Sequence, residues 1–450
     1  MIARSFCRKF FNSPAIFSFS STYDIVINGA GPAGAALACA LSHSSQFPSD
    51  NPSILLLDVQ SFDSTQEFLK KSTKVSDQRI VTLTPGSIRF LKSLQVWDKL
   101  DLNRVVPFYS MQVWESLGGS HFVVENDEKE MGRTIEVKHL QSVLFDRLKE
   151  LKRCEIAIPS SIENIKQENP GFLDLELIDG RKIKTKLLIG SDGARSKVKQ
   201  FSKIPTYGWS YNQMGIVCTI ETTIKEEKPA AFQRYLTSGP LALLPLWDTY
   251  FSIVWTVSLE EYEALMKISD EKFLAELNFS LTKPSKNPPA SLSLQEAKPF
   301  HYPPLITRIC NKRMAFPLNT LQSQRYIGNR LALIGDAAHS IHPMAGQGLN
   351  MGLADCMLLT NLLIKNLKGG MDIGDENNLY EYEKQSKRMN YTMSLTVEAI
   401  KTGFGIQNGL VSGLRSLALS GINNFGSLQE IIRKGADGDF FLPEKFLWEN

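Results

Sequence analysis

The chain has few of the residues that build metal sites or disulfide frameworks. Only six cysteines and six histidines occur in 450 residues. The cysteines form no CxxC pair and have no histidine at the spacing of a metal ligand. The sequence therefore predicts no metal site and reduced, buried thiols. The cysteines are Cys7, Cys39, Cys154, Cys218, Cys310 and Cys356.

The net charge is also small, and the sequence lacks long hydrophobic runs. Lys and Arg number 50 against 47 acidic residues, which gives a net charge of only +3. Because nucleic-acid-binding proteins carry a marked excess of basic residues, this balance sets that class aside. No stretch has the ~20 uninterrupted apolar residues of a membrane-spanning helix. With 43% hydrophobic and 22% charged residues, the composition is that of a globular protein, and the length predicts two or more packed units.

The first 22 residues have the make-up of a mitochondrial transit peptide. They contain Arg4, Arg8 and Lys9, many serines and phenylalanines, and no acid. The alternative is a disordered N-terminal tail. A secretory signal is disfavoured because Arg8 and Lys9 interrupt any apolar core.

A short strand, a glycine turn and a helix follow this leader. Tyr23–Asn28 is apolar and predicts a strand, and an Ala/Leu-rich helix is expected to run through Leu41. Between them Gly29, Gly31 and Gly34 form a GxGxxG pattern. In that setting the first glycine permits the tight turn, the second lets a pyrophosphate approach the backbone, and the third lets helix and strand pack closely. The turn predicts a dinucleotide site.

The next apolar strand ends in an acid that suits the same ligand. Residues 53–57 lead into Asp58, 24 residues after Gly34. That is close to the ~20 residues expected for the acid that binds a ribose hydroxyl. The alternative is a surface loop acid. The turn alone does not separate NAD from FAD.

Two later strand-and-turn segments extend the pattern. Residues 186–190 predict a buried strand, and Asp192 and Gly193 predict a turn after it. Residues 330–334 predict another strand, followed by Gly335-Asp336 and by the segment 342–350, which opens a long helix. Gly346 and Gly348 let backbone approach a planar ring, and the helix start near Leu349 and Asn350 offers N–H groups to negative charge. Asp336 is placed to accept from a sugar or ribityl hydroxyl.

These three segments resemble the class A flavoprotein monooxygenases. That family carries GxGxxG, then DGxxSxxR, then GDAAHxxxPxxGQGxNxGxxD, and the last pattern is matched here through Gly352 and Asp355. The resemblance covers residues 23–400. It implies an α/β fold with a Rossmann-like FAD-binding domain of the para-hydroxybenzoate hydroxylase type, an interleaved β-sheet substrate domain and a helical C-terminal tail.

The resemblance also assigns roles at the cofactor. It implies that FAD carries the chemistry through a C4a-hydroperoxide, so no protein residue is expected to be catalytic. Arg79 is expected to approach the flavin or the pyrophosphate, its alternative being a surface charge, and His339 and His342 are expected to hold the turn. The other cofactor-binding residues are Gly29, Gly31, Gly34, Asp58, Asp192, Gly193, Asp336, Gly346, Gly348, Leu349 and Asn350, with Pro343 and Gly346 lining the ring.

Three further segments are similar to the ubiquinone-biosynthesis hydroxylases within that family. They are residues 77–87, 207–213 and 231–246, although ordinary core strands are the alternative interpretation. Together with the leader, they favour the mitochondrial branch that hydroxylates the ring of a polyprenylated 4-hydroxybenzoate. The resemblance implies FAD, O2, a polyprenylated phenolic substrate, membership of a ubiquinone-biosynthesis complex, and peripheral contact with the matrix face of the mitochondrial inner membrane.

Three positions depart from the family pattern. Asp58 stands where Glu is frequent, and Val137 stands where an Asn would offer an amide. Lys199 replaces an Arg and keeps the charge, but it lacks the planar fork that grips phosphates. The resemblance implies either NADPH or a ferredoxin with its ferredoxin reductase as the electron donor, and Lys199 is compatible with the second.

We expect a chain that crosses between two domains. The FAD-binding domain is predicted from residues 23–105, 136–203 and 326–385, and the substrate domain from residues 106–135 and 204–325. A helical region follows over 386–450. Within it, residues 393–432 alternate apolar and small side chains, which suits either an interfacial helix on a membrane or a helical lid.

Two other functions share these motifs. One is a flavin-dependent reductase or desaturase of an isoprenoid, and the other is a non-catalytic, flavin-holding subunit of a biosynthetic complex. A plain NAD-dependent dehydrogenase is disfavoured because nothing in that class requires the segment 335–350.

Overall fold

The computed structural model defines the fold for most of the chain. The predicted leader, apart from Thr22, lies outside the described residues, and so does most of the predicted helical tail after Gly405. The structure describes residues 22–47, 53–71, 77–116, 121–125, 129–283, 300–343, 346–405 and 446–449.

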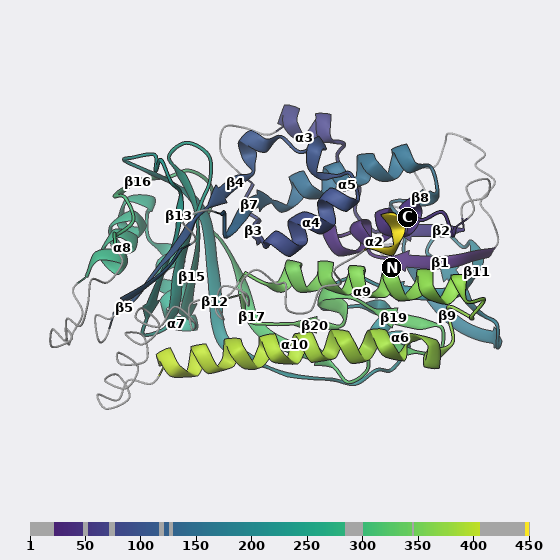
Figure 1. Ribbon diagram of the computed structural model, residues 1–450. Coiled ribbons are helices and arrows are strands. Elements are labelled where there is room, and N and C mark those ends of the chain that lie inside the picture. The colour runs from purple at the N-terminus through teal and green to yellow at the C-terminus, as the bar shows by residue number, and fades with distance from the viewer. Residues whose placement is uncertain are drawn as a thin grey trace.

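A largely parallel sheet forms one half of the molecule (Figure 1). Its described strands run in the order β18-β19-β11-β1-β2-β8, and β10 and β9 extend it from β11. Strands β19, β11, β1, β2 and β8 are mutually parallel. The bounds are β1 Thr22–Asn28, β2 Ile54–Leu57, β8 Cys154–Ala157, β9 Ile162–Asn169, β10 Phe172–Leu177, β11 Lys182–Gly190, β18 Ile327–Gly328 and β19 Leu331–Leu333.

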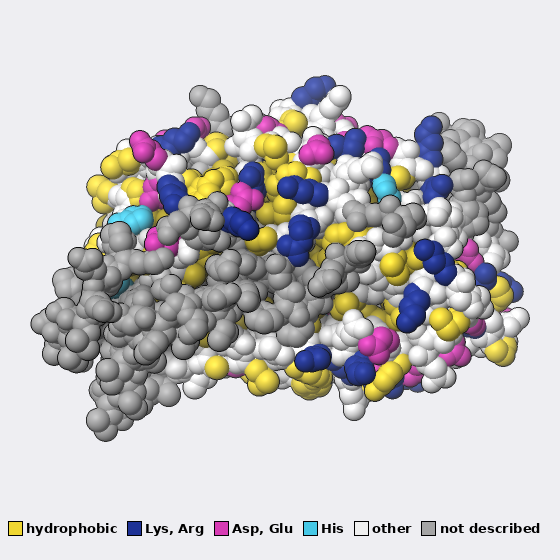
Figure 2. Space-filling view, viewed as in Figure 1, with side chains coloured by type: hydrophobic (Ala, Val, Ile, Leu, Met, Phe, Trp, Pro, Cys, Tyr) yellow, Lys and Arg dark blue, Asp and Glu magenta, His cyan; other side chains and the backbone are white. Residues whose placement is uncertain are grey.

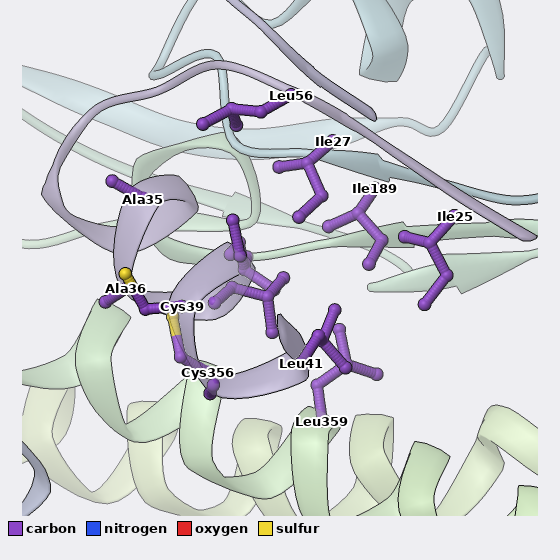
Figure 3. Close-up of a cluster of buried hydrophobic side chains, with 14 of the residues drawn as sticks. Ile25, Ile27, Ala35, Ala36, Cys39, Leu41, Leu56, Ile189, Cys356 and Leu359 are labelled. Atoms are coloured by element: carbon purple, nitrogen blue, oxygen red, sulfur yellow. The ribbon is translucent and has the colours of Figure 1, made fainter. Parts of the chain in front are cut away.

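Helices cover this sheet through a continuous apolar core. Helix α2 (Pro32–His43) begins with proline in its first turn, where a missing N–H costs nothing, and continues with alanines and leucines that are fully buried. Figure 3 shows Ala36, Cys39 and Leu41 of α2 between the sheet residues Ile25 and Ile189 and the helix α9 (Gly348–Lys368). Helix α5 (Val137–Leu151) packs against α2 as well.

A sheet that is antiparallel except for the parallel pair β13–β5 forms the other half, and it is called the antiparallel sheet below. Its described strands run β20-β17-β12-β15-β14-β13-β5-β6, with β16 beside β12, and helices α7 (Leu259–Lys267) and α8 (Asp270–Thr282) pack on it. The bounds are β5 Ser110–Glu115, β6 His121–Glu125, β12 Thr206–Thr222, β13 Ala230–Leu236, β14 Gly239–Pro245, β15 Tyr250–Ser258, β16 Ile306–Ile309, β17 Met314–Ser323 and β20 His339–Ser340.

A small third sheet lies at the junction of the two halves (Figure 1). It consists of β3 (Ile80–Leu83), β7 (Gly132–Glu136) and β4 (Val106–Phe108). The predicted substrate segment 106–135 is thus split, because only β5 and β6 join the antiparallel sheet, while β4 and β7 pair with β3. The proposed domain boundaries stay a prediction.

A long helix connects the halves. Helix α10 (Glu376–Gly405) runs beside α9 and continues beneath the antiparallel sheet (Figure 1). Its Tyr391 and the Tyr207 of β12 share a hydrogen bond of 2.5 Å between their hydroxyl groups. In the part of the chain that is described, no helix has both the length and the apolar character needed to cross a membrane. The remaining helices are α3 Thr65–Lys71, α4 Pro85–Ser93 and α6 Lys197–Phe201.

Candidate active site

The three motif segments follow neighbouring parallel strands. The register pairs Asn28 of β1 with Gly190 of β11, and Gly190 with Leu333 of β19. It also pairs Asn28 with Leu57, the residue before Asp58. All four strands therefore end at the same edge of the sheet, which is where open α/β sheets bind their ligands. The predicted strands and the helices that follow the first and third motifs are confirmed.

Two of the three glycines in the first motif are tightly packed, and the remaining one is open. Gly29 has φ of +112°, and a Cβ at Gly34 would lie 1.9 Å from the carbonyl oxygen of Gly29. A Cβ at Gly31 would meet no described atom within 4 Å. No described side chain caps α2, and no acid stands in its first turn. This leaves the positive end of the helix available to an anion beside Gly31.

Asp58 holds the glycine turn from the neighbouring strand. Its carboxylate accepts a hydrogen bond from the Ala30 N–H at 2.7 Å and one from the Gln60 N–H at 2.8 Å. The side chain is half-buried. Asp58 therefore lies next to the predicted pyrophosphate position, and its contact with a ribose hydroxyl stays a prediction.

The second motif closes against the first. The Ser191 hydroxyl donates to the Gly29 carbonyl oxygen at 2.6 Å, and Asn28 Nδ2 donates to Asp192 Oδ2 at 2.9 Å. Among the described residues, the other carboxylate oxygen of Asp192 is buried without a hydrogen-bond partner. Gly193 has φ of +80°, as its predicted turn requires. Asp192 thus offers a free acceptor at the edge where the strands end.

Lys199 lies behind this turn. Its side chain is largely buried, and its ammonium donates to the Ala194 carbonyl oxygen at 3.4 Å. Burial lowers the pKa of Lys199, and the nearby charge of Asp192 opposes that effect. The ammonium is therefore engaged with the protein backbone.

The third motif is held by a buried acid on α9. Asp355 is fully buried, and its carboxylate accepts from the Gly335 N–H at 2.8 Å, from His339 Nε2 at 2.6 Å, and from the Ser386 hydroxyl on α10. Gly335 has φ of +55°, so the turn needs glycine there. His339 is thereby engaged in holding the turn, as the sequence predicted, and α10 is linked to the same acid.

The first and third motifs touch directly. A Cβ at Gly352 would lie 3.4 Å from the Cα of Gly335 and 3.5 Å from the Cβ of Ala33. The Cys356 thiol donates to the Ala33 carbonyl oxygen at 3.1 Å. The N-terminal turns of α2 and α9 are therefore adjacent, although more than 300 residues separate them in sequence.

Asp336 faces water beside these helix starts. Its side chain is exposed, yet protein surrounds the carboxyl closely enough to raise its pKa, an effect opposed by the charges of His339 and Arg79. Arg79 is also exposed. The charge of Arg79 therefore acts on Asp336, and the contact of either residue with the cofactor stays a prediction.

The start of α9 is pinned to the β3–α4 connection. The Asn350 side-chain oxygen accepts from the Thr84 N–H at 3.0 Å and from the Ser87 hydroxyl at 2.7 Å, and its amide nitrogen donates to the Thr82 carbonyl oxygen at 2.9 Å. Gly346, with φ of +61°, lies against Thr82. The Asn350 side chain is therefore committed to positioning the turn. Around Gly348 a Cβ would meet no described atom within 4 Å.

A cluster from three elements lies behind Pro343. The ring of His342 packs edge-on against Tyr211 of β12, with 4.8 Å between centroids, and Tyr211 donates to Glu398 of α10. Lys401 lies 4.0 Å from the centre of the Tyr211 ring. Burial, reinforced by Lys401, lowers the pKa of His342 to about 4. His342 is therefore a neutral packing residue at neutral pH.

This geometry fits an extended flavin dinucleotide. The open space at Gly31 and Gly348, two uncapped helix N-termini and the free oxygen of Asp192 lie along one edge of the sheet. Helix N-termini suit a pyrophosphate and a ring that takes negative charge. The donors present are those that a dinucleotide needs.

Comparison with known proteins supports FAD as the ligand of this site. Residues 22–393 match the family described as "FAD binding domain". The chain is 33% identical to "Ubiquinone biosynthesis monooxygenase COQ6, mitochondrial" of Homo sapiens, with 92% of each chain covered. It is 28% identical to the protein of the same name from Dictyostelium discoideum, over 98% of this chain and 96% of that one. The chain belongs to the ubiquinone biosynthesis monooxygenase family.

A solved structure supports the fold of this monooxygenase. The p-nitrophenol 4-monooxygenase PnpA of Pseudomonas putida superposes with a TM-score of 0.71 at 17% identity, covering 95% of this chain and 100% of that chain. The predicted family, the α/β fold class, the FAD cofactor and the monooxygenase class are confirmed. The mitochondrial names of the relatives support the predicted mitochondrial location. The individual contacts to FAD stay predictions.

Sequence reasoning missed several residues that shape the site. Asp355 was recognised only as part of a pattern, whereas the structure makes it the acceptor for three donors. Ser191 joins two motifs through its hydroxyl group. The only available signal was position, since both residues lie inside motif segments. Arg104, considered below, carried no motif signal, and Glu136 lay in a run that was compared with the family pattern only for its neighbour Val137.

Proposed function

We propose that this monooxygenase hydroxylates the aromatic ring of a polyprenylated hydroxybenzoate-type intermediate in ubiquinone biosynthesis, with O2 as the oxygen source. The observation that carries the proposal is the meeting of three motifs at one sheet edge, with Ser191 against Gly29 and Ala33 against Gly352. The relatives named for ubiquinone biosynthesis, similar over more than nine-tenths of the chain, support the substrate class.

In this proposal the chain's own residues bind the cofactor and orient it. Gly31 and the start of α2 bind the pyrophosphate, Asp58 and Asp336 accept from sugar and ribityl hydroxyls, and the start of α9 faces the ring. When bound and reduced, FAD supplies the activation of O2 that the reaction requires. The antiparallel sheet and α10 are joined beside this site through Tyr211, which contacts His342 and Glu398.

Labelled oxygen tests the proposal. The FAD-loaded protein receives a short-chain prenylated 4-hydroxybenzoate, a chemical source of electrons and isotopically heavy O2. We expect a product that carries one heavy oxygen atom on the ring. A product that differs only in hydrogen content would instead indicate a reductase or desaturase, and the absence of turnover with intact FAD binding would indicate a flavin-holding subunit.

We infer that ferredoxin, with its reductase, supplies the electrons in place of NADPH. The support is Lys199, whose ammonium is engaged with the Ala194 carbonyl oxygen and lacks the fork that grips a nucleotide phosphate. Anaerobic bleaching of the flavin absorption compares the two donors, with Lys199→Arg as the matched variant. Reduction by ferredoxin and not by NADPH is expected in the wild type. Equal bleaching by NADPH alone contradicts the inference.

We further propose peripheral contact with the matrix face of the mitochondrial inner membrane through α10. Figure 2 shows hydrophobic side chains next to charged side chains of both signs along the edge that α10 forms. Leu395 is 71% exposed, and Tyr380 and Ile400 of the same helix are exposed as well. Exposed apolar side chains on a helix suit contact with a bilayer surface.

Co-sedimentation with phosphatidylcholine–cardiolipin vesicles tests this contact. Leu395→Asp is expected to weaken vesicle binding severalfold. Leu69→Asp is the control, because Leu69 is also exposed but lies on α3, at the opposite edge of the molecule (Figure 1). Equal loss in both variants, or no loss in Leu395→Asp, overturns the assignment of α10.

A further inference from the structure

A buried ion pair joins distant parts of the chain at the small central sheet. Glu136, the last residue of β7, is 1% exposed. Arg104 grips it with two parallel hydrogen bonds, Nε to Oε2 at 2.8 Å and Nη2 to Oε1 at 2.7 Å. Paired bonds of this kind fix orientation as well as distance. The pair therefore locks β7 to the segment that precedes β4.

The same pair reaches into the antiparallel sheet. The guanidinium carbon of Arg104 lies 4.0 Å from the centre of the Trp247 ring, and Trp247 belongs to the connection between β14 and β15. A guanidinium stacked on an indole is attracted by the ring quadrupole and excludes water from the pair. Arg104 thus contacts the small central sheet through Glu136 and the β14–β15 connection of the antiparallel sheet through Trp247.

On its other side, Glu136 holds the backbone that carries Arg79. Its Oε1 accepts from the Asp77 N–H at 2.8 Å, and Asp77 Oδ1 accepts from the Arg79 N–H at 3.2 Å. The Arg79 carbonyl oxygen accepts from the Val137 N–H at 2.9 Å, and Ile80 pairs with Glu136 in the β3–β7 register. The segment 77–80 is therefore fixed by Glu136 and its neighbour.

We propose that Glu136 and Arg104 are positioning residues that hold Arg79 near Asp336 in the turn of the third motif, and that Trp247 couples this hold to the antiparallel sheet. The inference rests on the proposed placement of FAD beside Asp336. The role of the pair is to keep the Arg79 charge at a fixed place beside that turn.

A double-mutant cycle on FAD affinity separates positioning from plain stability. The variants are Glu136→Gln, Arg79→Gln and their combination, and the readouts are the FAD Kd of the apoprotein by flavin fluorescence, the visible spectrum of bound FAD, and the melting temperature. We expect Glu136→Gln to raise the FAD Kd about tenfold in the wild-type background, with a shifted flavin spectrum, and to have little further effect when Arg79 is already Gln.

Two further variants keep the test decisive. Arg104→Lys preserves the charge but loses the fork, and it is expected to raise the Kd in the same Arg79-dependent way if Glu136→Gln does not fold. Asp179→Asn breaks the half-exposed Arg181–Asp179 pair in a remote hairpin and is expected to change nothing at the flavin.

Either of two results overturns the inference. One is a Kd increase of equal size with and without Arg79, and the other is a lower melting temperature with unchanged FAD affinity and spectrum. The proposed function fails separately, through the absence of heavy oxygen in the product of the wild-type enzyme, whatever the cycle gives.

Discussion

Two glycines of the first motif face opposite surroundings and give the sharpest test of the site. A Cβ at Gly34 would lie 1.9 Å from the Gly29 carbonyl oxygen and 2.5 Å from the Ser191 hydroxyl oxygen. A Cβ at Gly31 would meet no described atom within 4 Å. Alanine at Gly34 must therefore disturb the protein, whereas alanine at Gly31 disturbs only what binds there.

The magnitudes follow from these contacts. In Gly34→Ala the backbone of the turn must move, and overpacking of this kind costs about 1–3 kcal/mol of stability or more. In Gly31→Ala two effects on stability, of about 0.5–1 kcal/mol each, offset one another. Alanine caps a helix less well than glycine, which destabilises the fold, but it also lowers the conformational entropy of the unfolded chain, which stabilises the fold. The added methyl group occupies the predicted pyrophosphate position, so a similar 1–3 kcal/mol is lost from binding, about 5- to 150-fold in Kd.

The assay compares the melting temperature of the apoprotein with its FAD Kd. Gly34→Ala is expected to lower the melting temperature and to bind FAD poorly, and Gly31→Ala is expected to keep the melting temperature while losing affinity. Gly171→Ala serves as control, because its Cβ would make only ordinary contact at 3.6 Å from Asn169. Wild-type FAD affinity in Gly31→Ala would refute the placement of the pyrophosphate.

Three other predictions concern single side chains. Asp336→Asn is expected to raise the FAD Kd about tenfold, since a charged acceptor for a hydroxyl is lost; an unchanged Kd in a fluorescence titration would count against its role. Asp355→Asn is expected to lower the free energy of unfolding by about 3 kcal/mol, because an NH2 group replaces one of the two acceptor oxygens that serve three buried donors, and the negative charge is lost; urea unfolding measures it. Burial, reinforced by the charge of Arg104, lowers the pKa of His139 to about 4. Below about pH 6.5 the unfolded chain therefore binds a proton that the folded chain does not, and stability falls as pH falls. Between pH 7 and pH 5 the wild type is expected to lose about 2 kcal/mol more than His139→Gln in urea unfolding, and equal losses would contradict the assignment.

The sequence was sufficient to predict the strands and turns of the flavin side. Each motif combined a short buried run with a turn whose glycines have a steric reason, as at Gly29 and Gly34. Because parallel strands end at one edge, placing the motifs after β1, β11 and β19 also places them together. Local pattern and global topology agree there.

The remaining contacts depend on pairings that the sequence pattern does not encode. The strands β4 and β7 alternate like any half-buried strands, so their departure from the antiparallel sheet to join β3 was not predicted. The Arg104–Glu136 pair is separated by 32 residues and has no fixed spacing to signal it. The link from Asp355 to Ser386 requires knowing that α10 packs on α9.

Locating FAD in a crystal structure of the FAD-loaded protein tests the central claim most directly. The account predicts the pyrophosphate within hydrogen-bond distance of the backbone N–H groups at the start of α2, and the isoalloxazine against the turn that ends at Asn350. An FAD whose ring lies away from the start of α9, or whose pyrophosphate lies away from Gly31, would contradict it.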